Sequence, residues 1–131
     1  MNKIELAFEK TKKALTRLDE VVHMPLDQQR TIVDATIQRF EFSIELFWKL
    51  LKVILASEGV ETGTPKTVLQ QAYIAQYIHD EKLWLAMLAD RNETSHTYNE
   101  GLALTIYTHI KERYNPLLQK TMQDLEKHIT Q

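Results

Sequence analysis

The sequence predicts an all-α protein, built as an antiparallel bundle of four to five helices. Gly and Pro each occur three times in 131 residues, so the chain has little of the turn chemistry that many short strands would need. Apolar residues recur at steps of three and four along several stretches, which is the spacing of amphipathic helices. The length suits one domain, residues 1–131, that can bury a sizeable core.

The first two helices follow from their apolar stripes. We expect one at about residues 2–23, ended by Pro25, and a longer one at about 28–57, with Asp27 as its N-cap and Gly59 as its stop. The longer helix has a second apolar face, so it should lie centrally in the bundle or at a contact between subunits. The first stripe contains Ile4, Phe8, Leu15, Leu18 and Val22; the seam of the long helix contains Ile37, Phe40, Ile44, Phe47, Leu51 and Ile54, and its second face contains Leu46, Leu50 and Val53.

Two further helices are expected in the middle of the chain. Thr64 and Pro65 have the pattern of an N-cap followed by a first-turn proline, which opens a helix that runs to about His79. Asp80 can cap the next helix, at about residues 81–92. The residues of that helix expected to face inward are Trp84, Met87 and Leu88.

The last helix has the sharpest start signal. Thr97-x-x-Glu100 is a capping-box pattern, which puts Tyr98 at the first helical position. Pro116 removes a backbone donor and should kink the helix near residues 112–115. Apolar residues continue on both sides of the kink: Leu102, Ile106 and Ile110 before it, and Leu118, Met122, Leu125 and Ile129 after it.

The segment from Asp90 to Tyr98 concentrates groups suited to phosphodiester chemistry. Arg91 offers a planar fork of donors that fits a phosphate, and His96 can move protons near neutral pH. If one helix ends near Asn92 and the next begins at Tyr98, the turn between them can bring Arg91 and His96 to one cleft. Arg91 would then hold a phosphate oxygen while His96 takes a proton from a ribose 2′-hydroxyl, a cleavage that requires no metal. Alternatively, Arg91 pairs with a nearby acid and His96 is a polar loop residue.

Two other charged clusters each have a structural and a functional interpretation. Glu41 and Glu45 lie one turn apart, with Lys49 one turn further on. They form either a solvated stripe or an acid near the cleft that orients His96. A basic strip on the first helix is either ordinary exposed surface or a contact to an RNA backbone. The strip consists of Lys10, Lys13 and Arg17.

Composition narrows the classes of function. The net charge of −2 gives no global field that attracts nucleic acid, so RNA binding would need a local patch. The absence of Cys removes disulfides and thiolate sites and fits a cytoplasmic protein. No apolar run reaches the roughly 18–20 residues of a membrane helix. Neither metal-ligand spacing nor a Gly-rich phosphate loop occurs, so we expect no metal and no cofactor.

Three blocks of the sequence carry a resemblance to a known family: Phe40–Lys49, Thr64–Ala72 and Trp84–Tyr98, the last of which contains the pattern Arg-x4-His-x-Tyr. They resemble the HEPN domains, small helical proteins, in the branch called nucleotidyltransferase substrate-binding proteins. They share the family's order and together span most of the chain from residue 40 to 100. The first and last helices match the family only in pattern.

This resemblance implies a homodimeric bundle in which the motifs of two subunits lie close together across a cleft. Arg91 and His96 would be the catalytic pair of an RNase toxin, and Asn92 matches the polar residue that follows the motif arginine. The partner would be a minimal nucleotidyltransferase antitoxin, which neutralises the toxin by transferring AMP to Tyr98. The family also leaves open a non-catalytic subunit that binds a nucleotide or presents a substrate to the nucleotidyltransferase.

Overall fold

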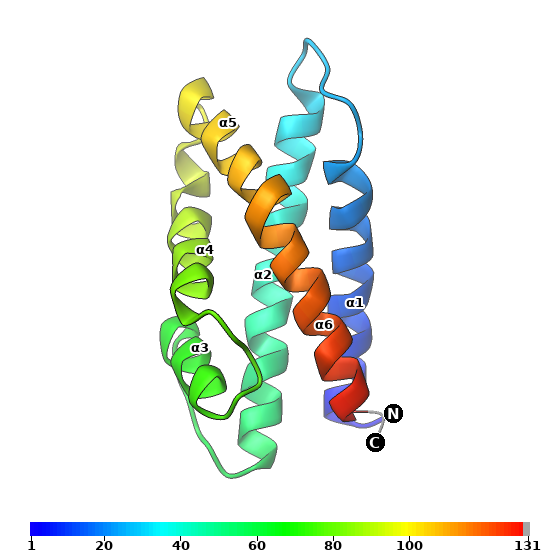
Figure 1. The fold of residues 1–131 in the computed structure, drawn as a ribbon, viewed down its shortest axis with the longest axis vertical. Coiled ribbons are helices and arrows are strands. Elements are labelled where there is room, and N and C mark those ends of the chain that lie inside the picture. The colour runs from blue at the N-terminus through cyan, green and yellow to red at the C-terminus, as the bar shows by residue number, and fades with distance from the viewer. Residues whose placement is uncertain (130–131) are drawn as a thin grey trace.

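The computed structural model describes residues 1–129, and every regular element in this range is a helix. The predicted fold class, an all-α antiparallel bundle, is therefore confirmed (Figure 1). The elements are α1 (Lys3–Val22), α2 (Thr31–Ser57), α3 (Pro65–Ile74), α4 (Glu81–Glu93), the 3-10 turn η1 (Thr94–His96), α5 (Glu100–His109), the π-turn η2 (Ile110–Tyr114) and α6 (Asn115–Ile129). Because α5, η2 and α6 follow one another without a loop, they form one long rod.

The longest helix, α2, is the centre of the bundle. It packs against α1, α3, α4 and α5, and the α5–α6 rod crosses diagonally in front of it (Figure 1). The start of α1 and the end of α6 lie at the same end of the molecule (Figure 1). On the second apolar face of α2, Leu50 is buried, whereas Leu46 and Val53 remain half-buried. The central position predicted for this helix is confirmed.

The predicted seam of α2 forms the middle of the hydrophobic core, and all of its residues are buried. Phe47 packs on Trp84 of α4 with ring centroids 5.1 Å apart, and Phe40 stacks on Tyr114 of η2 at 5.7 Å. Aromatic pairs at these separations stabilise the fold beyond the area that they bury. The two contacts hold α4 and the rod to opposite parts of the same seam.

The start of α2 differs from the prediction. The helix begins at Thr31 and not at residue 28, because Arg30 adopts a left-handed conformation with φ of 65°. Arg30, and not Asp27, therefore occupies the N-cap position. Asp27 still accepts a hydrogen bond from the backbone N–H of Ile32 at 3.1 Å, and this bond lowers the pKa of its carboxyl below the ordinary value.

The third helix is shorter than the sequence predicts. It ends at Ile74 and not near His79, since Gln76 adopts a positive φ of 67° and the N–H of Tyr77 turns back to the carbonyl of Ala72. Asp80 caps α4 as predicted, its carboxylate accepting the N–H of Leu83 at 3.3 Å.

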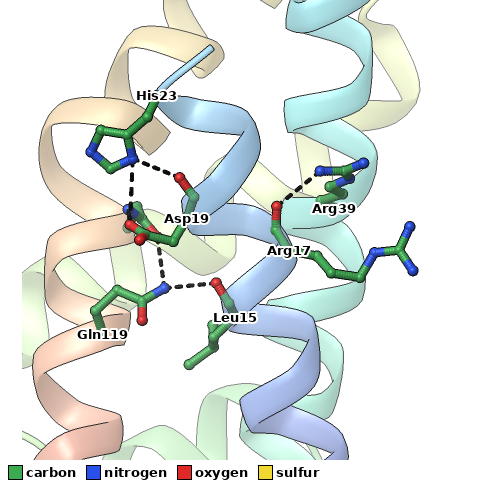
Figure 2. Close-up of polar contacts among 7 residues, drawn as sticks. Leu15, Arg17, Asp19, His23, Arg39 and Gln119 are labelled. Atoms are coloured by element: carbon green, nitrogen blue, oxygen red, sulfur yellow. Dashed lines mark hydrogen bonds and ion pairs between the residues drawn. The ribbon is translucent and has the colours of Figure 1, made fainter.

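The last helix, in which a kink was predicted near residues 112–115, loses its regular α-helical form at that place. The π-turn Ile110–Tyr114 interrupts the rod just before Pro116. Proline has no N–H to give to the carbonyl of Glu112, so the regular α-helical hydrogen bond is missing there, and the wider turn accommodates the loss. Polar bonds then tie α6 to α1. Asn115 donates to Asp19 at 2.9 Å. Gln119 donates to the carbonyl of Leu15 at 2.8 Å (Figure 2).

Replacing Thr64 by Ala should lower the free energy of unfolding by about 1 kcal/mol. Thr64 caps α3 as predicted: its hydroxyl oxygen accepts the N–H of Thr67 at 3.2 Å, and Ala would leave that donor without its partner. Thr16→Ala, at an exposed site in the middle of α1, should change the free energy by less than about 0.5 kcal/mol. Urea unfolding of both variants measures the difference, and equal effects would contradict the role of the cap.

Candidate active site at the end of helix α4

The motif residues lie on the last turn of α4, on η1 and on the turn before α5. The chain stays helical past Asn92, where an end was expected, and continues as a 3-10 turn to His96. Two threonines stabilise this extension. The hydroxyl of Thr94 donates to the carbonyl of Arg91 at 2.7 Å, and that of Thr97 donates to the carbonyl of Thr94 at 3.0 Å.

The predicted capping box is wrong. α5 begins at Glu100, and its N-cap is Asn99, whose side chain accepts the N–H of Leu102 at 3.1 Å. The Thr97 hydroxyl instead donates back to the carbonyl of Thr94 in η1. Tyr98 consequently lies outside the helix, with 82% of its surface exposed.

Arg91 is held in a fixed orientation. One terminal nitrogen, Nη2, lies 2.7 Å from a carboxylate oxygen of Glu45 on α2, and the other, Nη1, donates to the Asn92 side chain at 3.2 Å. The Arg91 side chain is still 33% exposed. A guanidinium has five N–H donors, so those not used here can bind an anion arriving from solvent.

Glu45 is the carboxylate that organises this side of the site. The indole N–H of Trp48 donates to it at 3.0 Å, and Lys49 forms an ion pair with it at 3.2 Å. Burial works to raise the pKa of Glu45, but the hydrogen bonds from Trp48 and Lys49 and the charge of Arg91 outweigh burial and lower it. The carboxylate is therefore ionised at neutral pH and holds Arg91 by charge as well as by hydrogen bonding.

His96 and Tyr98 form a second pair on the surface. Their rings meet edge to face with centroids 6.0 Å apart, and both side chains are exposed. Within residues 1–129, no hydrogen bond or ion pair joins His96 to Arg91 or to an acid. The acid expected to orient His96 instead orients Arg91, and Glu41 one turn away is exposed.

Sequence reasoning missed the residue that fixes the turn of the motif. Arg30, at the start of α2, donates a hydrogen bond to the backbone carbonyl of Thr97 and also pairs with Asp34 at 3.0 Å. The bond joins residues 67 positions apart, so no local pattern signals it. It ties the segment between His96 and Tyr98 to the central helix.

A partly buried polar cluster next to Arg91 was also missed. The carboxylate of Asp90 accepts a hydrogen bond from the hydroxyl of Tyr114 at 2.6 Å and lies 2.7 Å from Nδ1 of His109. Burial, and then the hydrogen bond to Asp90, raise the pKa of Tyr114 well above its ordinary value, so it stays protonated and donates. The cluster fixes the end of α4 against the rod.

Residues 1–129 contain neither a cluster of metal-ligating side chains nor a membrane-spanning helix. No three or more His, Asp or Glu side chains gather in a position to hold a metal ion. None of the helices combines the length and the apolar character needed to cross a membrane.

Comparison with known proteins decides the family. The family model for "Nucleotidyltransferase substrate binding protein like" matches residues 6–127, nearly the whole chain. The chain belongs to this nucleotidyltransferase substrate-binding family. The resemblance carried by the three sequence blocks is thereby confirmed, and the match extends to the first and last helices, which resemble the family in sequence only by pattern.

The chain is also similar to individual proteins, two of which carry functional names. A Haemophilus influenzae protein named "Probable ribonuclease HepT" is 28% identical over 120 residues, which cover 86% of this chain and 82% of the relative. The crystal structure of a Thermus thermophilus protein matches with a TM-score of 0.79 and 37% identity, covering 88% of this chain and 98% of that one. HI0074 from Haemophilus influenzae, described as having the fold of a substrate-binding domain of a nucleotidyltransferase, matches with a TM-score of 0.68 and 26% identity, covering 94% and 96%.

Replacing Glu45 by Gln should make the free energy of unfolding less dependent on pH in the acid range. The folded pKa of Glu45 is lower than its ordinary value of 4.5, so the ionised carboxylate stabilises the fold. This stabilisation is fully present above pH 4.5 and disappears as the pH falls through the lowered folded pKa. Urea unfolding of both proteins between pH 7 and acid pH should show a difference at neutral pH that shrinks on acidification, whereas Glu41→Gln, at an exposed site on the same helix, should show none.

Proposed function

We propose that this chain is a metal-independent endoribonuclease whose catalytic pair is Arg91 and His96. The observation that carries the proposal is the arrangement of the motif: a half-buried guanidinium held by Glu45, with donors still free, five residues before an exposed imidazole. The name of the Haemophilus influenzae relative, a probable ribonuclease, supports the same activity.

The proposed reaction is an internal transfer of the phosphodiester. Neutral His96 accepts the proton of the ribose 2′-hydroxyl, and the 2′ oxygen attacks the neighbouring phosphorus. The bond from phosphorus to the 5′ oxygen of the next nucleotide breaks, and that oxygen receives a proton from an imidazolium group. The products are a 2′,3′-cyclic phosphate and a 5′-hydroxyl. Arg91 binds a non-bridging phosphate oxygen, whose charge grows as the fifth bond to phosphorus forms.

A homodimer would complete this site. In a single chain Arg91 is held by Glu45 of α2, whereas the His96 ring meets the ring of Tyr98, so the two side chains are oriented by different partners. Two motifs facing each other across a twofold axis would supply two guanidiniums and two imidazoles to one phosphodiester. One imidazole could then act as base while the other acts as acid.

Control by a nucleotidyltransferase is the second part of the proposal. The partner enzyme, a minimal nucleotidyltransferase, would transfer AMP to the hydroxyl of Tyr98 and so neutralise the chain as the toxin of a toxin–antitoxin pair. The exposure of Tyr98 makes its oxygen accessible to another enzyme. A phosphate attached there would lie beside His96, where its charge competes with that of an RNA phosphate for Arg91.

The activity is tested by incubating the purified chain with single-stranded RNA in EDTA and identifying the product ends. We expect cleavage that leaves 2′,3′-cyclic phosphate and 5′-hydroxyl ends. A dimer verified by mass to carry no AMP that still fails to cleave RNA would contradict the proposal.

A second candidate function is favoured by the family's own description and by that of HI0074. In this case the chain is a non-catalytic subunit that binds a nucleotide or presents a substrate to the nucleotidyltransferase. This second function predicts that the chain forms a stable complex with the nucleotidyltransferase and binds a nucleotide. It also predicts that the parent cleaves no RNA, so that His96→Ala changes nothing in the cleavage assay. Isothermal titration with ATP, beside the cleavage assay, separates the two functions.

A further inference from the structure

A groove of about 420 Å³ lies between α1 and α2, and none of the motif residues lines it. It is lined by seven residues, of which two are arginines, Arg17 from α1 and Arg39 from α2, and none is acidic. The rest of the lining is two alanines with Gln38, Phe42 and Leu46. The groove thus joins positive charge with apolar and aromatic surface.

The two arginines point to the same side of the helix pair. Nη1 of Arg39 donates to the backbone carbonyl of Arg17 at 3.0 Å, a bond that crosses from α2 to α1 and fixes the Arg39 guanidinium (Figure 2). The Arg17 guanidinium extends away from α1 on the side opposite Gln119 of α6 (Figure 2), and it makes no hydrogen bond or ion pair within residues 1–129. Both guanidiniums therefore retain N–H donors for an anion.

The aromatic ring in the groove is unusually exposed. Phe42 shows 59% of its surface to solvent, although Phe40 and Phe47 on the same helix are fully buried. A flat apolar ring that shares a groove with cations offers a surface on which a nucleic-acid base can stack while its phosphates meet the charges.

The basic strip noted on the first helix extends this charge. Lys10 and Lys13 precede Arg17 by seven and four residues, which places them within about 40° of it around α1. Both lysines are exposed. The strip therefore continues the positive charge of the groove along α1 over about two helical turns.

The groove is next to the proposed active site along α2. Phe42 precedes Glu45 by three residues, a rise of about 4.5 Å along the helix axis, and Glu45 holds Arg91. Gln38, which lines the groove, is seven residues before Glu45 and so lies on nearly the same side of α2. A strand bound in the groove would lead towards Arg91.

We propose that the α1–α2 groove binds single-stranded RNA, with phosphates on Arg17 and Arg39 and a base stacked on Phe42. This inference rests on the proposed function, because it makes the groove a binding surface for the RNA cleaved at the motif. A symmetric contact between two copies about the groove would set the cations of one copy against those of the other. The charge of the groove therefore favours a polyanion over a second chain.

The test measures RNA binding separately from cleavage. A fluorescein-labelled single-stranded RNA is titrated with the full chain carrying His96→Ala, so that the RNA stays intact, and anisotropy is followed at several salt concentrations. Adding Phe42→Ala should weaken binding by about 5- to 100-fold, whereas Phe42→Trp should retain it. Adding Arg17→Gln should lower the slope of log affinity against log salt by about 0.7, the value for one lost phosphate contact.

Matched controls are available on other faces of the molecule. Lys120→Gln removes one exposed cation from α6, and Tyr73→Ala removes one exposed aromatic ring from α3. Both should leave the affinity and the salt slope unchanged. Because Phe42 and Arg17 are exposed, their variants should stay folded, which circular dichroism verifies.

The outcomes separate the groove from the proposed function. Weaker RNA binding by Phe42→Ala and by Arg17→Gln, with unchanged controls, supports the proposal that the groove binds RNA. It does so even if the parent cleaves no RNA and the nuclease proposal fails. If the parent cleaves RNA and both substitutions leave binding and cleavage normal, the proposal for the groove is overturned and the nuclease proposal stands. No RNA binding by the parent also overturns it. A loss of binding that coincides with a lower molar mass in light scattering overturns it too, because the face would then be a contact between copies.

Discussion

Replacing His96 by Ala is expected to lower the rate of RNA cleavage by about 10²- to 10⁴-fold, the usual contribution of a positioned general acid or base. The imidazole is the one group of the motif that can accept the 2′ proton near neutral pH. Because the side chain is exposed and its described contact is the edge of Tyr98, its removal should leave the fold intact. Single-turnover cleavage in EDTA, with thermal unfolding measured beside it, separates a catalytic loss from a structural one.

His79→Ala is the matched control, since His79 is another exposed histidine, in the loop between α3 and α4. It should cleave RNA at the rate of the parent. An equal loss in both variants would indicate a general effect of removing a histidine. Full activity of His96→Ala would remove His96 from the mechanism and leave Arg91 without its proposed catalytic partner.

Helix placement was predictable where a single strong pattern dominates. The apolar seam of α2 repeats at steps of three and four for several turns. Burial of Phe40 and Phe47 favours a central position for this helix, and that position does not depend on where the helix begins or ends. Pro116 likewise had one physical consequence, the loss of a backbone donor. These features depend on residues close together in the sequence, so spacing alone was enough to infer them.

Helix ends were less predictable because several residues compete for each cap. Both Thr97 and Asn99 can accept a backbone N–H, and the geometry of η1 decides between them by binding the Thr97 hydroxyl to Thr94. At the start of α2, the left-handed conformation of Arg30 puts the N-cap three residues after Asp27. Such choices depend on tertiary contacts that no local pattern contains.

The site was only half predictable for the same reason. The motif pattern predicted Arg91, His96 and Tyr98 as site residues, and the block around Glu45 predicted an acid near them. The partner of that acid depends on how α2 packs on α4, which the sequence pattern does not contain. The structure pairs Glu45 with Arg91 across 46 positions of sequence. Arg91 therefore pairs with an acid, as one of the two interpretations of the sequence had it. The pairing is compatible with the functional interpretation, because it orients the guanidinium without using all of its donors.

Replacing Tyr98 by Phe is expected to abolish transfer of AMP to this chain while RNA cleavage continues at about the parent rate. The phenol oxygen is the atom that would form the bond to the phosphorus of AMP, with pyrophosphate leaving from ATP, and Phe lacks it. The ring that meets His96 at 6.0 Å is retained, so the surroundings of the imidazole should change little. Incubation with the nucleotidyltransferase and labelled ATP, followed by mass analysis and the cleavage assay, measures both properties.

Tyr73→Phe is the control for this experiment, because Tyr73 on α3 is also exposed. It should accept AMP as the parent does and lose its nuclease activity on modification, whereas Tyr98→Phe should stay active in the presence of the nucleotidyltransferase. Labelling of Tyr98→Phe at the parent level would contradict the assignment of the acceptor. If the parent is labelled at Tyr98 and still cleaves RNA, the modification does not control the nuclease. The phosphate beside His96 would then fail to compete with RNA for Arg91.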